Sequence, residues 1–337
     1  MSQSPPIDLV TGACSYPGSH IAQLLLESGR QVRTLTFHPR RAHPLQRQVE
    51  ALAYRFDDPA ALVRSLEGVS TLYNTYWVRF DRGQTSFASA IENSRMLFFA
   101  AKRAGVQRIV HVSITNPSVE SPLPYFRAKA LVEYALAQSG SAYAIVRPTW
   151  LFGGSDVLVN NIAWILRHLP AFATPGSGSY PVQPVHVDDL ARICIDAAGA
   201  SQDLVIDAAG PELMRFSELV TRVRVAVGAH APVIALPPGL MSVAARALGL
   251  LVGDVVLTPD EITGLMAGLL VSHHPPRGQI AFSEWLAEHG TSLGSSYANE
   301  LQRHFNPVAH RGIIVPPRAR FPFSARPHGR LERRWGG

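Results

Sequence analysis

The sequence predicts an α/β protein in which a doubly wound parallel sheet of seven strands is followed by a small, mostly helical lobe. Two observations lead to this fold class. Apolar strand-like runs alternate with helix-like segments over residues 1–209, and from Gly210 onward the pattern is helical. The hydrophobic residues, 47% of the chain, are sufficient for a sizeable core in 337 residues.

The first unit of the predicted sheet is a strand, a tight turn and a helix over Ile7–Ser28. Gly12 allows a sharp exit from the strand, and Gly18 lets the helix pack closely against it. Unpaired N–H groups at a helix N-terminus bind pyrophosphate, so this corner predicts a dinucleotide-binding Rossmann domain. Ser15 replaces a middle glycine and could donate a hydrogen bond to phosphate, and Tyr16 is expected to contact the cofactor. A structural glycine turn is the alternative.

The residues after the second strand, Gln31–Thr36, indicate which dinucleotide binds. No acidic residue lies between positions 28 and 49, where NAD-binding domains place a carboxylate on the ribose 2′-hydroxyl. His38, Arg40 and Arg41 instead offer positive charge to a 2′-phosphate. We therefore expect NADP(H), with NAD as the alternative; a solvated basic loop is the other interpretation.

The third and fourth strands are predicted over Ala51–Phe56 and Val69–Tyr73. After the third strand, Asp58 is expected to cap a helix and Asp57 to lie near the adenine edge of the cofactor. Asn74 ends the fourth strand, at the sheet edge where dinucleotides bind, and is expected to contact the cofactor.

The loop after the fourth strand is rich in aromatic residues. Tyr76 and Trp77 lie beyond a strand's carboxyl end, so they are candidates for covering the nicotinamide or the substrate. Packing against the second lobe is an equal alternative. A long helix is predicted over Phe87–Ala104; Asn93 in its interior needs a polar partner, and the cofactor is our candidate.

The catalytic residues are predicted at the end of the fifth strand, Arg108–Val112. Ser113 follows this strand directly, and Tyr125 and Lys129 come later, four residues apart on one helix face. A phenol has a pKa of about 10, so it works as an acid or base near neutrality only if a cation such as Lys129 stabilises the phenolate. Ser113 is expected to orient the substrate oxygen.

Five segments carry a resemblance: TGACSYPG (Thr11–Gly18), Ser113, YFRAK (Tyr125–Lys129), RPTWLFG (Arg147–Gly153) and PVHVDDLA (Pro184–Ala191). With them the chain resembles, over about the first 300 residues, the extended or atypical branch of the short-chain dehydrogenase/reductase superfamily, of the NAD(P)-dependent epimerase/dehydratase type. The resemblance implies NAD(P) binding by the first loop, Ser/Tyr/Lys catalysis, a ribose contact from Lys129 and a C-terminal substrate lobe. It extends to NAD(P)H-sensing regulators and to the nucleotide-binding accessory subunit of respiratory complex I, which frequently lack the Tyr or Lys kept here.

The sixth strand is predicted over Tyr143–Arg147 and ends at Pro148, where the resemblance implies the nicotinamide end of the cofactor. Trp150 and Asn160 would then lie near the substrate.

His186 is the last candidate substrate residue, although a structural role for it is favoured. One carboxylate of Asp188-Asp189 is expected to cap a helix over Leu190–Ala198. A seventh strand is predicted over Leu204–Ala208.

The C-terminal lobe is predicted to be helical over Phe216–Val227, Leu240–Leu251, Pro259–Leu270 and Phe282–His289. The apolar run Gly239–Leu257 is interrupted by Arg246, Gly253 and Asp254, which favours a buried amphipathic helix over a membrane span. His273-His274 has no further ligands at suitable spacing, so no metal site is expected.

The formal charge of +6 is concentrated after His304, and the body of the chain is close to neutral. We therefore expect no nucleic-acid partner and no integral membrane segment. Two cysteines and the absence of a signal peptide before the first strand fit a reducing, cytoplasmic setting; a homodimer remains open. The expected divisions are a Rossmann domain over 1–209 with lobe elements inserted after 150, a substrate lobe over 210–306 and a flexible basic tail over 307–337.

Together these features predict an NADP(H)-dependent oxidoreductase, or an enzyme of the epimerase/dehydratase type, that acts on a carbonyl/alcohol group of a small molecule. The alternative is an NAD(P)H-binding regulatory or assembly protein without turnover. The substrate lobe has no motif that identifies a substrate.

Overall fold

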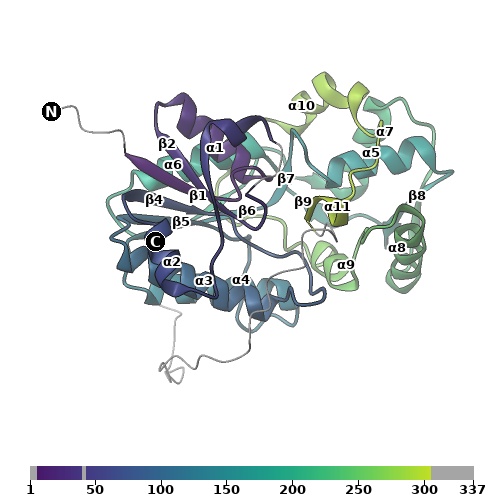
Figure 1. The fold of residues 1–337 in the computed structure, drawn as a ribbon. Helices are drawn as coiled ribbons and strands as arrows, with labels where there is room; N and C mark the ends of the chain where they lie inside the picture. Colours follow the sequence, from purple (N-terminus) through teal and green to yellow (C-terminus); the bar gives the residue numbers. More distant parts are fainter. Residues whose placement is uncertain (1–5, 40–42, 305–337) are drawn as a thin grey trace.

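The protein has the predicted α/β architecture (Figure 1), seen in a computed structural model that describes residues 6–39 and 43–304. Its centre is a parallel sheet of seven strands in the order β11-β6-β5-β4-β1-β2-β3. The chain reverses direction across the sheet between β1 and β4, and ligands of open α/β sheets bind in the crevice at such a point. Arg40, Arg41 and the predicted tail lie outside the described residues.

The seven predicted strands are all present, with small shifts at their ends. They are β1 (Ile7–Thr11), β2 (Gln31–Thr36), β3 (Val49–Ala53), β4 (Val69–Asn74), β5 (Arg108–Val112), β6 (Tyr143–Pro148) and β11 (Leu204–Ala208). The third strand ends earlier than predicted, at Ala53; the Tyr54 N–H still donates to the Thr36 carbonyl of β2 at 3.2 Å, and Tyr54 stacks on Phe56 with ring centroids 4.9 Å apart.

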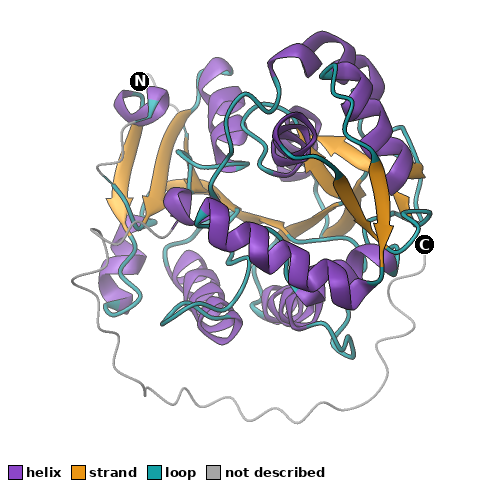
Figure 2. Ribbon diagram, turned by 90° about the vertical axis from the view of Figure 1, so that its right-hand side faces the viewer, coloured by secondary structure: helices purple, strands orange, loops and turns teal. Residues whose placement is uncertain are grey.

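Helices cover both faces of the sheet (Figure 2). They are α1 (Gly18–Glu27), α2 (Pro59–Ser65), α3 (Phe87–Arg103), α4 (Pro124–Gln138) and α6 (Val187–Ala198). Ile21 of α1 and Leu190 of α6 belong to the buried cluster on one face. Leu62, Leu97 and Leu136, from α2, α3 and α4, belong to the cluster on the other face. Apolar burial on two faces explains why the central strands β5 and β6 are almost fully buried.

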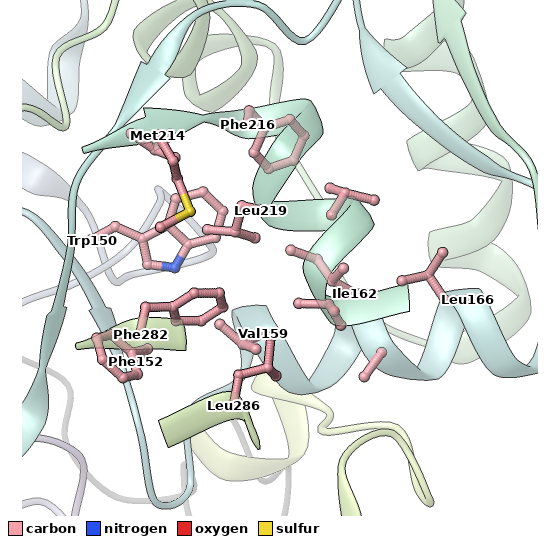
Figure 3. Packing of buried hydrophobic residues seen from close by; sticks show 14 of the residues in the cluster. Trp150, Phe152, Val159, Ile162, Leu166, Met214, Phe216, Leu219, Phe282 and Leu286 are labelled. Carbon is pink, nitrogen blue, oxygen red and sulfur yellow. The ribbon is translucent and has the colours of Figure 1, made fainter. Parts of the chain in front are cut away.

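The second lobe combines short strands and helices from residue 150 onward. Its elements are β7 (Trp150–Phe152), α5 (Leu158–His168), β8 (Phe172–Pro175), β9 (Pro181–Val182), β10 (Pro184–His186), β12 (Met214–Arg215), α7 (Phe216–Ala226), β13 (Val233–Leu236), α8 (Pro238–Val252), α9 (Pro259–Met266), α10 (Phe282–His289) and α11 (Glu300–His304). Trp150, Phe152 and Phe282 lie at the centre of its own apolar core (Figure 3).

Helix α8 corrects one prediction, because the apolar run forms a helix that is not buried. Only Ala245 and Gly249 are buried in it, while Leu250 is 84% exposed. Its neighbours are few because it lies at the outer edge of the lobe (Figure 1). Over residues 6–39 and 43–304, no helix combines the length and apolarity needed to cross a membrane.

Candidate functional site

The loop between β1 and α1 forms a cradle that only glycine can complete at two positions. Gly12 has φ of +67°, a left-handed conformation that other residues rarely adopt. A Cβ atom on Gly18 would lie 2.5 Å from the Gly12 carbonyl oxygen, so α1 could not start so close to β1. The open cradle at a helix N-terminus fits a dinucleotide pyrophosphate. The Ser15 hydroxyl donates to the Gly12 carbonyl at 2.8 Å and thereby braces the loop.

Helix α1, which follows this loop, contacts α6 through a polar pair that the sequence did not predict. The Nδ1 atom of His20, on α1, lies 2.6 Å from the Asp188 carboxylate on α6. Tyr16 packs edge-on against His20, with ring centroids 5.8 Å apart. Burial, and then Asp156 and Asp188, raise the pKa of Tyr16 well above its ordinary value. The Tyr16 hydroxyl is buried without a hydrogen-bond partner among the described residues.

The Asn74 side chain points into the protein, where it organises the end of β4. It is fully buried, accepts a hydrogen bond from Thr11 at 3.3 Å and lies 3.1 Å from Nδ1 of His111. Asn93 has the polar partner that its place in α3 requires, because its amide donates to the Tyr76 hydroxyl at 2.9 Å. In this structure both asparagines therefore fix the loop after β4.

Lys129 is buried beside the end of β5, with 3% of its surface exposed. Its ammonium donates to the Val112 carbonyl at 3.0 Å and lies 4.3 Å from the centre of the Trp77 ring. Burial lowers the pKa of Lys129 to about 7, although Glu133 opposes the shift. The carbonyl contact brings α4 to the residue that precedes Ser113.

Tyr125 lies one turn before Lys129 in an aromatic setting. Its ring is 5.9 Å from that of Trp77 and 6.0 Å from that of Phe87, edge-on in both cases. Burial, and then the Glu261 carboxylate, raise the pKa of Tyr125 while Arg79 opposes the shift. This direction is opposite to the lowering expected from Lys129, because the ammonium is directed toward Val112 and Trp77.

Ser113 completes the predicted catalytic set at the end of β5. It is 3% exposed, and its hydroxyl has no hydrogen-bond partner among the described residues. A buried hydroxyl without a partner is uncommon, because each such group loses hydration on folding. Its backbone N–H is satisfied by the Val146 carbonyl at 2.8 Å. The backbone of Ser113 is thus held in place, while its buried hydroxyl keeps its capacity to donate a hydrogen bond.

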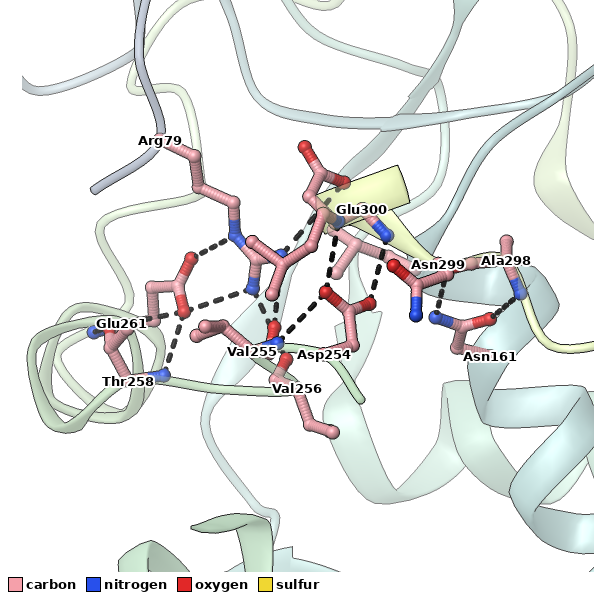
Figure 4. Close-up of polar contacts among 12 residues, drawn as sticks. Arg79, Asn161, Asp254, Val255, Val256, Thr258, Glu261, Ala298, Asn299 and Glu300 are labelled. Carbon is pink, nitrogen blue, oxygen red and sulfur yellow. Dashed lines mark hydrogen bonds and ion pairs between the residues drawn. The ribbon is translucent and has the colours of Figure 1, made fainter. Parts of the chain in front are cut away.

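Arg79 joins the loop after β4 to the second lobe (Figure 4). Its guanidinium donates to both carboxylate oxygens of Glu261, at 2.6 and 3.1 Å, and to the Val256 carbonyl at 3.2 Å. Glu300 lies 4.0 Å away. This contact positions Glu261 near Tyr125, and no local sequence pattern predicts it.

We expect Arg79→Ala to lower the free energy of unfolding by about 2 kcal/mol, because it strands Glu261 and removes charged hydrogen bonds. Arg95→Ala is the matched control, since Arg95 pairs with Glu92 on an exposed helix surface and should cost less than about 0.5 kcal/mol. Urea unfolding of both variants measures the difference; equal losses would show that Arg79 contributes no more than a surface pair.

The other predicted substrate residues lie apart from Tyr125. Trp150 is 6% exposed in the core of the second lobe and stacks on Phe216. Asn160 lines a polar cavity of about 370 Å³ and donates to the Ser296 carbonyl at 2.9 Å. Tyr76 packs among Phe37, Tyr54 and Phe56. Trp77 alone of this group contacts both Tyr125 and Lys129.

His186 has a structural role in this fold. Its Nδ1 atom accepts the Asp188 N–H at 3.2 Å and caps α6. The predicted carboxylate cap is wrong, because α6 begins at Val187 and therefore includes Asp188 and Asp189 in its first turn. Asp189 instead accepts backbone N–H groups of Gln279 and Ile280.

The remaining predicted cofactor residues lie at strand ends. His38 follows β2, and its backbone N–H donates a hydrogen bond to the Thr36 hydroxyl at 3.1 Å. Asp58 caps α2 as predicted, and Asp57 is partly exposed, 3.3 Å from Arg55. Pro148 ends β6, and its carbonyl accepts the Thr115 N–H at 3.0 Å.

The sheet order and the glycine cradle define a Rossmann-like α/β fold. Residues 12–162 match the family model described as NAD(P)H-binding. This part of the chain is thus similar to NAD(P)H-binding domains, and the α/β fold with a parallel sheet of seven strands is Rossmann-like, as the sequence predicted.

Two curated relatives are similar over most of this chain. The mitochondrial NADH dehydrogenase [ubiquinone] 1 alpha subcomplex subunit 9 of Arabidopsis thaliana is 25% identical over 65% of this chain, and the match covers 57% of that protein, less than two thirds of its length. The photosystem II assembly factor Ycf39 of Cyanidium caldarium is 25% identical over 72% of this chain and 78% of its own.

Among solved structures, the NADPH complex of the NADPH-dependent quinone oxidoreductase QOR2 of Escherichia coli superposes with a TM-score of 0.67. It is 21% identical and covers 84% of this chain and 99% of its own. At this identity the likeness is one of fold.

Proposed function

We propose that the protein is an NADP(H)-dependent reductase that converts a carbonyl group of a small molecule to an alcohol. The observation that carries the proposal is the contact between α4 and the end of β5. Lys129 of α4 donates a hydrogen bond to the Val112 carbonyl, and Val112 precedes Ser113, whose hydroxyl has no partner among the described residues. Tyr125 lies one helical turn before Lys129. Bound NADPH would supply the hydride. The NADPH-dependent quinone oxidoreductase of the same fold makes quinones a suitable first substrate class to test.

Each residue has a defined task in this proposal. Ser113 donates a hydrogen bond to the substrate oxygen and orients it. Tyr125 has a raised pKa, so its phenol stays protonated near neutrality and can give its proton to that oxygen as the alcohol forms. Lys129 and the Gly12–Gly18 cradle would hold the ribose and the pyrophosphate.

We predict that NADPH binds more tightly than NADH. Arg40 or Arg41 would donate charge-assisted hydrogen bonds to the 2′-phosphate of NADPH. The segment after β2 has no carboxylate that could accept a hydrogen bond from the free 2′-hydroxyl of NADH. Replacing both arginines with Ala should weaken the binding of NADPH by roughly 1.5–3 kcal/mol of binding free energy per lost hydrogen bond and leave that of NADH nearly unchanged. Calorimetric titration with both nucleotides measures this; equal affinities in the wild type would contradict the assignment.

A second candidate is an NAD(P)H-binding protein that assists the assembly of a larger complex without turnover. The contact of Lys129 with the Trp77 ring favours it, because a covered ammonium has less freedom to serve a substrate or ribose. The relatives named as a subunit of NADH dehydrogenase and as a photosystem II assembly factor support the same alternative. NADPH binding without oxidation, across a panel of quinones and aldehydes, would decide for it.

The setting that we expect for either function is the cytoplasm. Two cysteines in 337 residues fit a reducing compartment.

A further inference from the structure

The first turns of α1 and α6 lie side by side at the edge of the sheet that carries the glycine cradle. Helix α1 leads from β1 to β2 and α6 leads into β11, all parallel strands, so both helices begin at the carboxyl edge. His20 and Asp188 belong to these first turns, and Nδ1 of His20 lies 2.6 Å from the Asp188 carboxylate. Because helical side chains point back toward the helix N-terminus, the His20 ring lies over the end of α1 that borders the cradle.

The contact with Asp188 determines where His20 binds its second proton. A carboxylate only accepts hydrogen bonds, so the ring hydrogen lies on Nδ1 and the lone pair on Nε2. Among the described residues, Nε2 has no hydrogen-bond partner. This edge of the ring lies beside Gly154, where a Cβ atom would be 3.2 Å from Nε2. Gly154 lines the polar cavity of about 370 Å³, so a proton reaches Nε2 from solvent.

The other titratable side chains of this cluster keep one charge state near neutrality. Burial raises the pKa of Tyr16 well above its ordinary value, so its phenol stays neutral. Burial lowers the pKa of His186, so its imidazole stays neutral as well. The hydrogen bond from His20 lowers the pKa of Asp188, which is therefore a carboxylate. Histidine is the side chain whose charge ordinarily changes between pH 5 and 8, so His20 is the group available to take up a proton.

Two further charged side chains lie near this cluster, and both have partners of their own. Asp156 accepts two backbone N–H groups at the start of α5. Arg192, further along the first turns of α6, donates to Asp189 at 2.9 Å. The charge of Asp188 is therefore balanced by His20, and only while His20 is protonated.

The glycine cradle has no positively charged side chain of its own. Residues 11–29 contain no lysine or arginine, and Arg30 is bound to Asp8 at 2.6 Å. While His20 is neutral, Asp188 leaves a negative charge beside the N-terminus of α1, and this charge repels a pyrophosphate. Protonation of His20 makes the pair with Asp188 neutral. Dinucleotide binding and protonation of His20 therefore favour each other.

We propose that the dinucleotide binds to this chain together with a proton, which Nε2 of His20 takes up. The proposal rests on the NADPH binding proposed above and does not depend on turnover. A pyrophosphate at the cradle stabilises the imidazolium, so the complex holds this proton at a higher pH than the free protein does. The affinity therefore falls as the pH rises through the range in which His20 loses its proton, and is level below that range.

Calorimetric titration of the full chain with NADPH at about pH 7.5, in phosphate and in Tris buffer, counts the protons, because the two buffers differ in ionisation enthalpy. The wild type should take up a fraction of a proton more than His20→Gln, whose amide still donates to Asp188 but does not titrate. The 2′-phosphate is common to both titrations and cancels in the difference. His168→Gln is the matched control, since His168 is exposed in the last turn of α5 and should keep the wild-type count.

The affinities give a second readout. His20→Gln should bind NADPH about 3-fold to 10-fold more weakly than the wild type at about pH 6, and equally at about pH 9, where histidine is neutral. Asp188→Asn leaves His20 in place and removes the negative charge. This variant should bind NADPH about 3-fold to 10-fold more tightly than the wild type at about pH 9. Melting temperatures equal to that of the wild type establish that the variants are folded.

The proposal is overturned if the wild type and His20→Gln take up the same number of protons, or if their affinities keep the same ratio from about pH 6 to pH 9. An Asp188→Asn variant that binds no more tightly than the wild type at about pH 9 would also overturn it, whether or not His20→Gln folds. Either result leaves the proposed NADPH binding intact. A wild type that shows no binding of NADPH would overturn both proposals.

Discussion

Tyr125→Phe is expected to lower the rate of NADPH-dependent carbonyl reduction roughly 100-fold to 10,000-fold, the range for loss of a general acid. Phenylalanine keeps the ring that packs on Trp77 and Phe87 and removes the proton that the substrate oxygen receives. The fold and the affinity for NADPH should therefore change little. The measurement is NADPH oxidation with a panel of quinones and aldehydes, together with calorimetric titration of the nucleotide.

The matched control is Tyr134→Phe on the same helix, because Tyr134 is 42% exposed and lies away from the site. This variant should keep the wild-type rate. If Tyr125→Phe also keeps it, Tyr125 is not the acid. If the wild type binds NADPH but oxidises it with no member of the panel, the assembly role becomes the better function.

The sheet was predictable because its signals are local. Thr11-Gly12 ends an apolar run and Gly18 opens a helix, and these few residues fix a strand, a turn and a helix. The central strands β5 and β6 are almost fully buried, so each contains a short apolar run bounded by turn residues. The stacking of Tyr54 on Phe56 just after β3 is a tertiary contact that no local pattern reveals.

The polar contacts around the site were not predictable in the same way. His20 pairs with Asp188 across 168 positions of the chain, and Arg79 with Glu261 across 182. Each residue alone reads as an ordinary charged or polar side chain. The packing of α1 against α6 brings His20 to Asp188, and the packing of the second lobe against the loop after β4 brings Arg79 to Glu261. Both contacts therefore depend on tertiary structure.

The catalytic set shows a finer limit of sequence reasoning. Spacing of four residues placed Tyr125 and Lys129 on one helix face, as expected. The spacing alone does not determine where the long, flexible side chain of Lys129 places its ammonium group. The Val112 carbonyl and the Trp77 ring, on two other elements, hold it, so burial and Glu261 determine the pKa of the phenol instead.

Lys129→Met should change how stability depends on pH. In the folded protein, burial lowers the pKa of Lys129 to about 7, whereas in the unfolded chain the pKa of lysine is about 10.4. Between these values the unfolded chain binds a proton that the folded protein does not, so this group makes stability rise with pH. Below about pH 7 both states are protonated, and the cost of burying the ammonium is fully present. Methionine has no such cost.

The wild type should therefore gain about 3 to 5 kcal/mol relative to Lys129→Met between about pH 7 and pH 10. Near pH 7 the two proteins should be similar in stability, because the variant avoids the burial of a charge but loses the hydrogen bond to Val112 and the contact with Trp77. Urea unfolding of both proteins over this range gives the difference directly, since other titrating groups are common to both and cancel. Parallel pH profiles would show that the ammonium keeps its ordinary pKa. If Lys129 also holds the ribose, the variant should bind NADPH more weakly at every pH below 7, which titration of the same samples measures.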